Sequence, residues 1–150
     1  MKKEQKELLL NTLLRGVQHG LNVMRGDTIY DLYMVGDQKA VVVKTLMSNL
    51  EAFPITELKP IMRPISDMKP DEVKRLYDIL SIDMDNNDWL KVNDLGVMRL
   101  YSENGKEYRD IAKSMDYLDS IHVDYRGLIK SGIAIDITKN KQIKLVWKSL

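Results

Sequence analysis

The chain has 150 residues, of which 44% are hydrophobic and 30% charged, a composition typical of soluble globular proteins. Its 23 basic and 22 acidic residues give a formal net charge of +1, without the basic excess usual in proteins that bind phosphate backbones. Cysteine is absent, which excludes disulfides, thiolate nucleophiles and zinc–cysteine sites. No apolar run is long enough to span a membrane and no signal-peptide cleavage site follows the basic start, so we expect a single cytoplasmic domain over residues 1–150.

Residues 3–20 are predicted to form a helix, because apolar side chains recur every three or four positions. These are Leu9, Leu10, Leu13, Leu14, Val17 and Leu21. Gly20 suits a left-handed cap at the end of this helix. His19 lies at the negative end of the helix dipole, so we interpret it as a terminal residue rather than a ligand.

Residues 21–65 are rich in β-branched and aromatic side chains, which predicts two or three antiparallel strands with turns at Gly26 and Gly36. A further strand is predicted over 50–55. In the next segment, Pro60 and Pro64 cannot donate hydrogen bonds to a neighbouring strand, so we expect an edge strand or an extended connector. Together these strands predict a small twisted sheet or half-barrel on which the first helix packs.

The second half of the chain is predicted to contain two more helices. The first, over 69–80, has Pro70 at its first position and the acidic pair Asp71 and Glu72 in its first turn, where the dipole favours negative charge. The second, over 107–122, has Leu118 and His122 on its buried face and Asp119 on its exposed face.

Short strands complete the predicted fold: a hairpin over 89–102 that turns at Asn93-Asp94, and closing strands over 132–137 and 142–147. The whole pattern predicts an α+β fold, in which a small antiparallel sheet or half-barrel packs with about three helices in a single domain.

Residues 83–94 match part of a calcium-binding loop. Positions one, three, five and twelve are occupied by Asp83, Asp85, Asn87 and Asp94. The motif requires glycine at position six and a bidentate glutamate at position twelve, and this chain has Asp88 and Asp94 there. We therefore interpret the segment as a solvated acidic turn, and no metal or cofactor is predicted.

Residues 122–126, His-Val-Asp-Tyr-Arg, contain the best candidates for chemistry. In a catalytic role, His122 would be a general base oriented by Asp124, with Arg126 binding an anion. In a structural role, His122 continues the apolar face of the helix, Gly127 makes the turn, and Asp124 and Arg126 pair with each other or cap backbone groups. We favour the structural role, because a lone histidine on an apolar face is usually structural and no nucleophile is visible nearby.

The C-terminal residues 138–150 contain lysines without acidic neighbours: Lys139, Lys141, Lys144 and Lys148. Such lysines could contact phosphates, but they more often form a solvated edge that discourages strand-to-strand aggregation. We favour the solvated edge.

Two blocks of sequence carry a family resemblance. They are Leu-Lys-Pro-x-x-Arg-Pro-x-Ser at 58–66 and Asp-Tyr-Arg-Gly-Leu-Ile at 124–129. As a pair they resemble a family of small uncharacterised proteins encoded by phages and prophages of Bacteroides-type gut bacteria. The resemblance implies an origin in a bacterial host but no catalytic role. It also suggests that Arg63 and Arg126 connect the end of the third helix to the Pro-Arg-Pro segment.

Three functional hypotheses follow. The leading one is a non-enzymatic phage accessory protein that binds a host or phage protein. Its candidate binding residues are His122, Asp124, Tyr125, Arg126 and Arg63. The second is a nucleic-acid-associated protein that uses the C-terminal lysines, and the third is a small nucleotide-binding or hydrolytic enzyme centred on residues 122–126. A homodimer is an open alternative, and no membrane partner is expected.

Overall fold

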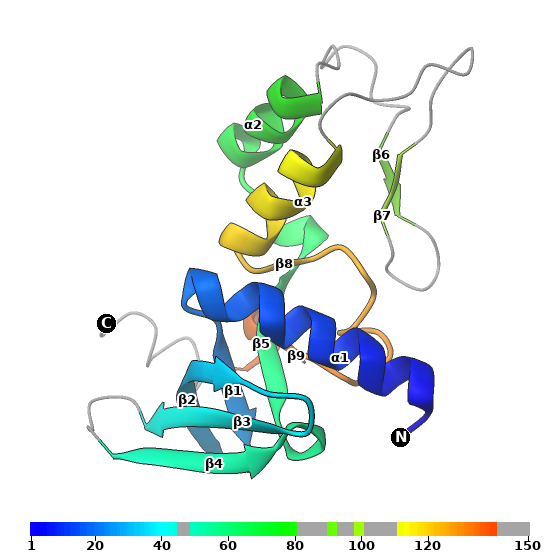
Figure 1. The fold of residues 1–150 in the computed structure, drawn as a ribbon. Coiled ribbons are helices and arrows are strands. Elements are labelled where there is room, and N and C mark those ends of the chain that lie inside the picture. Colours follow the sequence, from blue (N-terminus) through cyan, green and yellow to red (C-terminus); the bar gives the residue numbers. More distant parts are fainter. Residues whose placement is uncertain (45–48, 81–89, 93–97, 101–110, 141–150) are drawn as a thin grey trace.

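The computed structural model describes residues 1–44, 49–80, 90–92, 98–100 and 111–140 (Figure 1). Within these residues, three α-helices accompany a seven-stranded mixed sheet and a separate two-stranded hairpin. The sheet is not closed, and its strand order is β4-β3-β2-β1-β5-β8, with β9 also paired to β5. The predicted single-domain α+β fold is therefore confirmed, although the sheet is mixed rather than wholly antiparallel.

The first helix, α1 (Lys3–Gly16), continues as a 3-10 turn, η1 (Val17–His19). It ends where predicted, at Gly20, whose φ of 68° gives the left-handed cap. Leu9 and Leu13 of α1 are fully buried against the sheet. They anchor the main core, to which the strands contribute Val23, Tyr30, Leu32, Ala40 and Val42.

The antiparallel part of the sheet follows the chain order. Its strands are β1 (Asn22–Arg25), β2 (Thr28–Val35), β3 (Lys39–Lys44) and β4 (Leu50–Pro54). Both predicted turns, at Gly26 and Gly36, fall between strands as expected. After β4, a 3-10 turn, η2 (Ile55–Glu57), leads to β5 (Lys59–Pro64).

The strand β5 lies inside the sheet, so the prediction of an edge strand or connector was wrong. It pairs antiparallel with β1 on one side and parallel with two short strands, β8 (Val123–Asp124) and β9 (Ile135–Asp136), on the other. Each parallel pairing spans only two residues, Arg63 and Pro64 with β8 and Ile61 and Met62 with β9.

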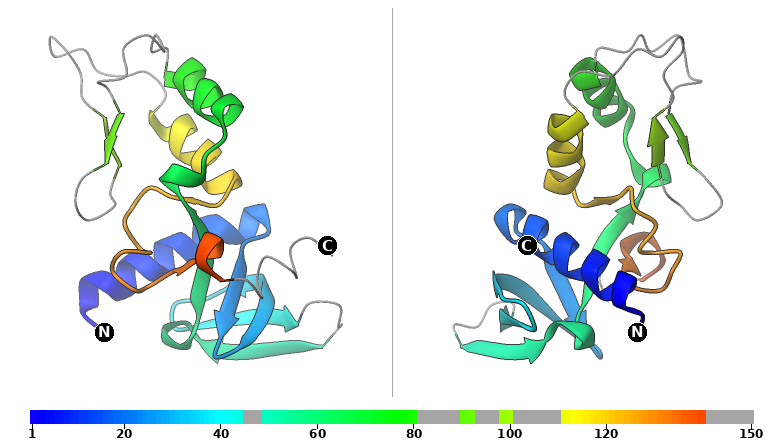
Figure 2. Two further views of the ribbon diagram at one scale, coloured as in Figure 1. Left: turned by 180° about the vertical axis from the view of Figure 1, so that it is seen from behind. Right: turned by 45° about the vertical axis from the view of Figure 1, so that its right-hand side comes forward.

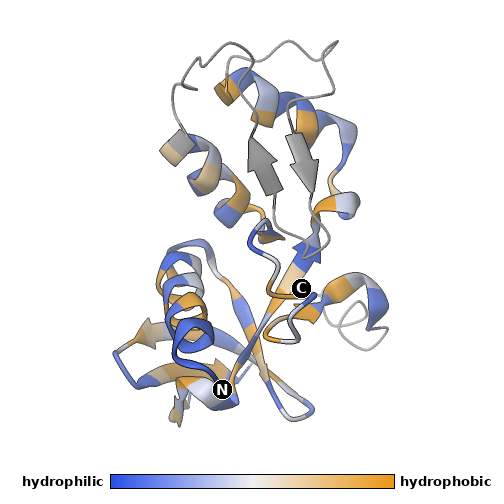
Figure 3. Cartoon of the chain, turned by 90° about the vertical axis from the view of Figure 1, so that its right-hand side faces the viewer, coloured by the Kyte–Doolittle hydropathy of each residue, from blue (hydrophilic) through white to orange (hydrophobic). Residues whose placement is uncertain are grey.

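The helices α2 (Pro70–Leu80) and α3 (Ile111–Ser120) pack on each other above the sheet, after a third 3-10 turn, η3 (Ile65–Asp67). Leu76, Leu80 and Leu118 are buried between them, in a second core that also includes Val123 and Tyr125. Figure 3 shows hydrophobic and hydrophilic residues alternating along both helices, as expected for helices with one buried face.

The remaining strands agree with the prediction in part. β6 (Leu90–Val92) and β7 (Met98–Leu100) form the predicted antiparallel hairpin. The predicted strand over 132–137 is shorter than expected, because only β9 pairs and Ile137–Lys139 forms a 3-10 turn, η5. The predicted strand over 142–147 lies outside the described residues. Among the described helices, none is long and apolar enough to cross a membrane.

Replacing Gly16 by alanine is expected to destabilise the fold by about 1–3 kcal/mol, the usual cost of overpacking a core. A Cβ at this position would lie 2.3 Å from Cδ2 and 2.7 Å from Cβ of the buried Leu21. Urea denaturation measures the change, with Gln18→Ala at an exposed position as the control. Unchanged stability of Gly16→Ala would show that this close approach imposes no constraint.

Candidate functional site

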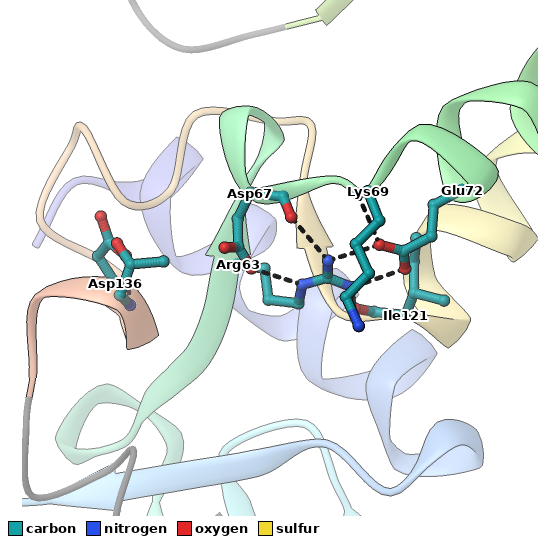
Figure 4. Close-up of polar contacts among 7 residues, drawn as sticks. Arg63, Asp67, Lys69, Glu72, Ile121 and Asp136 are labelled. Atoms are coloured by element: carbon teal, nitrogen blue, oxygen red, sulfur yellow. Dashed lines mark hydrogen bonds and ion pairs between the residues drawn. The ribbon is translucent and has the colours of Figure 1, made fainter.

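Arg63, near the end of β5, connects the sheet to the helices above it (Figure 4). Its Nη1 and Nη2 donate to the two carboxylate oxygens of Glu72 at 2.8 and 2.7 Å, and its Nε donates to Asp67 at 2.9 Å. Nη2 and Nη1 also donate to the carbonyl oxygens of Asp67 and Ile121, at 3.0 and 3.4 Å. The backbone N–H of Arg63 donates to the carbonyl of His122 at 2.8 Å. One side chain thus joins β5 to η3, α2 and the turn after α3.

Glu72 supplies the counter-charge to Arg63. The two side chains are only 14% and 15% exposed, so their attraction is less screened than at an open surface. The hydrogen bonds from Arg63 lower the pKa of Glu72 from 4.5 to about 2, against the opposing effect of burial. Glu72 also accepts the backbone N–H of Lys69 at 2.9 Å, which caps the first turn of α2.

Asp124 caps the turn that follows β8. Its Oδ1 accepts the N–H groups of Arg126 at 3.2 Å and Leu128 at 3.0 Å, and its Oδ2 accepts the N–H of Ile129 at 2.8 Å. The turn passes through Gly127, whose φ of 80° is readily adopted only by glycine. Both oxygens of the buried Asp124 carboxylate therefore accept hydrogen bonds from backbone groups, which is the capping role predicted for a structural Asp124.

Asp119 is the centre of a polar cluster between α3 and α1. It accepts a hydrogen bond from Arg15 at 2.9 Å and one from the Tyr125 hydroxyl at 3.4 Å. Arg126 stacks over the Tyr125 ring, with Cζ 4.4 Å from the ring centroid, and donates to the Tyr125 hydroxyl and to Thr12 Oγ1. Burial is the main cause that raises the pKa of Tyr125 to about 12.

Asp119 was predicted to lie on the exposed face of its helix, and this prediction is wrong. Its side chain is only 6% exposed. The pattern within the helix could not reveal the reason, because the partner Arg15 lies 104 residues earlier in the chain.

His122 occupies the turn between α3 and β8, with an unusual positive φ of 61°. The backbone N–H of His122 donates to the backbone carbonyl of Asp119 at 3.2 Å. Burial lowers the pKa of the imidazole, the nearby His19 and Arg63 lower it further, and Asp119 opposes them. The neutral imidazole is therefore favoured at this junction.

The structure separates the two arginines that were expected to act together. Arg63 connects the end of α3 to the Pro-Arg-Pro segment through Ile121 and His122. The side chain of Arg126 instead donates to Tyr125 and Thr12, which joins the turn to α1.

The other candidates lie largely outside the described residues. Lys139 is exposed in η5, whereas Lys141, Lys144 and Lys148 are not described. The calcium-loop candidates Asp83, Asp85, Asn87 and Asp94 are not described either. In the part of the chain that is described, no three histidine or acidic side chains gather in a group that could hold a metal ion.

A cleft of about 540 Å³ lies between α1 and the sheet, and we call it the α1–β3 cleft. The turn before β3 and the η2 segment form its other walls. Its charged and apolar lining residues are Lys3, Lys6, Glu7, Leu10, Asp37, Lys39, Pro54 and Ile55. A smaller cleft of about 290 Å³ lies where Arg126 and Lys130 approach the start of α1.

Comparisons of the chain with protein-family models, curated proteins and solved structures found no match. The family resemblance of residues 58–66 and 124–129 thus stays a prediction. In the structure the two blocks are neighbours, because Pro64 pairs with Asp124 between β5 and β8.

Glu72→Gln is expected to lower the free energy of unfolding by about 2 kcal/mol at pH 7, because the amide loses charge-assisted hydrogen bonds with Arg63. Since folding lowers the pKa of Glu72 from 4.5 to about 2, the contribution is complete above pH 4.5 and is lost as the pH falls towards 2. Urea denaturation from pH 7 to pH 3 should show the difference between parent and variant shrinking.

The control for this experiment is Asp71→Asn, an exposed position in the same helical turn, which should change stability by less than about 0.5 kcal/mol. His122 titrates in parent and variant alike and cancels in the difference. Equal stability of Glu72→Gln and parent at pH 7 would contradict the role of the ion pair.

Proposed function

We propose that the protein acts by binding a segment of another protein in the α1–β3 cleft, as a non-enzymatic accessory protein. The observation that carries this proposal is the cleft itself, a concave surface of about 540 Å³ lined by both charged and apolar residues. Ligand sites usually combine an apolar interior with a few polar groups that fix orientation.

The chemistry of the cleft indicates what it would bind. Leu10 is partly buried and Pro54 is exposed, so together they offer an apolar surface for a side chain of the partner. The cleft is lined by more basic than acidic side chains. The basic residues are Lys3, Lys6 and Lys39, and the acidic residues are Glu7 and Asp37. The positive end of the α1 dipole lies at the same end of the helix as Lys3. An apolar side chain flanked by acidic residues would suit this arrangement.

Asp124 and Arg126 make contacts within the fold, which favours a binding surface elsewhere over catalysis at this turn. The Asp124 carboxylate binds three backbone N–H groups, and Arg126 is engaged with Tyr125 and Thr12. These side chains stabilise the junction of α1, α3 and β8. Their hydrogen-bonding groups are engaged in contacts within the fold.

The resemblance of residues 58–66 and 124–129 to phage and prophage proteins supports a partner from the host or the phage. In this proposal, the chain meets that partner in the cytoplasm of a bacterial host. It would act by occupying a binding surface of the partner, with no reaction of its own.

The double variant Lys6→Glu/Lys39→Glu is expected to lose at least about tenfold in binding, equivalent to about 1.4 kcal/mol, because it reverses two charges that line the cleft. Tagged parent and variant are incubated with host lysate, and the proteins retained are quantified by mass spectrometry. Circular dichroism first establishes that the variant is folded.

The matched control is Lys59→Glu/Lys74→Glu, which makes the same charge change at exposed positions that do not line the cleft. It should retain the same protein as the parent. If both double variants retain the parent's partner equally, the cleft is not the binding surface. If the retained material is nucleic acid released by nuclease, the protein-binding proposal fails.

A further inference from the structure

The strand β4 forms one margin of the sheet, on the side away from α2 and α3 (Figure 2). Within the part of the chain that the structure describes, no strand pairs with its outer edge. Along the strand, only Phe53 is partly buried and the other residues are exposed. Strand edges are templates for pairing with another chain, and proteins usually protect them with lysines or bulges. β4 carries no lysine, and its register with β3 is uninterrupted, so its edge keeps the features that allow pairing.

The ladder between β3 and β4 shows which backbone groups of β4 point outward. The N–H of Ile55 donates to the carbonyl of Gln38 at 2.9 Å, one residue beyond the paired strands and in the same register. Residues that bond to a neighbouring antiparallel strand alternate, so Phe53 and Glu51 also direct their backbone groups toward β3. The residues whose backbone groups point away from the sheet are Leu50, Ala52 and Pro54.

The position of Pro54 agrees with this assignment. Proline has no N–H, and in β4 the missing donor falls on the outward side, where pairing with β3 does not need it. The outer edge therefore presents the N–H and carbonyl groups of Leu50 and Ala52 and the carbonyl of Pro54.

We propose that this edge pairs antiparallel with β4 of a second copy of the chain, about a two-fold axis through Ala52. A two-fold contact uses the same surface on both copies, and outward backbone groups must meet outward groups. In this arrangement the two Ala52 residues exchange both of their hydrogen bonds. The N–H of each Leu50 donates to the carbonyl of Pro54 in the other copy. Each outward N–H of β4 thus meets an acceptor.

The neighbouring registers fit less well. A shift of the second copy by two residues in one direction moves the axis to Glu51 and places two carboxylates directly opposite each other, which is destabilising. The same shift in the other direction moves the axis to Phe53. Leu50 then lies opposite η2, beyond the end of the partner strand, and only Ala52 donates. The axis through Ala52 avoids both defects.

The charges beside the edge are complementary in the Ala52 register. Glu51 of each copy lies opposite Phe53 of the other, on the same face of the sheet. Arg25 covers the Phe53 ring, with Cζ 4.1 Å from the ring centroid, and its side chain is 42% exposed. Each Glu51 carboxylate therefore approaches the Arg25 guanidinium of the other copy, which favours this pairing.

The paired stretch is short, because a strand of five residues measures about 17 Å. Its area is below that of a standard stable interface, so we expect a reversible dimer with a dissociation constant of about 0.1 mM. This dimer uses a different surface from partner binding in the α1–β3 cleft and does not depend on it.

Sedimentation velocity of the full chain from about 10 µM to 1 mM tests for the dimer. The parent should change from monomer to dimer over this range. Ala52→Lys places two lysines opposite each other on the axis and should raise the dissociation constant at least tenfold. The matched control is Ala112→Lys at an exposed position of α3, which should dimerise as the parent does. Circular dichroism first establishes that both variants are folded. A parent that stays monomeric, or equal dimerisation of Ala52→Lys and Ala112→Lys, would overturn the proposal.

A second experiment tests the register by cross-linking. Because the chain has no cysteine, Ala52→Cys introduces a single thiol. The Cα atoms of a hydrogen-bonded antiparallel pair lie about 5.5 Å apart, within the range of a disulfide. Mild oxidation should therefore cross-link Ala52→Cys into a covalent dimer at least fivefold faster than Asp27→Cys, which lies at an exposed turn.

The comparison with Glu51→Cys distinguishes the registers. Faster cross-linking of Glu51→Cys than of Ala52→Cys would place the axis at Glu51 and overturn the pairing that we propose. Equal rates for Ala52→Cys, Glu51→Cys and Asp27→Cys would show random collision and overturn it as well.

Discussion

The ion pair between Arg63 and Glu72 joins the strand β5, which borders two cores, to the helix α2. The main core lies between α1 and the sheet, and the second lies between α2 and α3. The strand β5 enters both regions, because Met62 packs in the main core and Arg63 follows it. A guanidinium that is 15% exposed needs partners for its donors, and Glu72, Asp67 and Ile121 supply them.

A second polar cluster joins α1 to the same junction. Asp119 accepts from Arg15 and Tyr125, and Arg126 covers the Tyr125 ring. The motif that looked most like a catalytic constellation is therefore part of the framework around the end of α3. Its polar residues pair with groups that meet at this place. Asp124 accepts backbone N–H groups, and Tyr125 donates to Asp119. The α1–β3 cleft, where we propose that a partner binds, is lined by other residues.

Local patterns were sufficient to predict most elements. The apolar spacing and Gly20 located α1, Pro70 located the start of α2, and the glycine turns located the strands β1 to β3. Contacts between distant parts of the chain were not predictable. The proline content of β5 suggested an edge, yet two-residue parallel pairings placed it inside the sheet. Asp119 followed an exposed pattern along its helix, and only α1 explains its burial.

The central claim is that Arg63 secures α2 and α3 to the sheet, and hydrogen exchange on Arg63→Lys tests it most directly. Lysine keeps the charge but cannot reproduce the two-pronged pairing with Glu72. We predict that amide protection falls in Pro70–Leu80 and Ile111–Ser120 while the strands β2 and β3 stay protected. Unchanged protection in both helices would contradict the account.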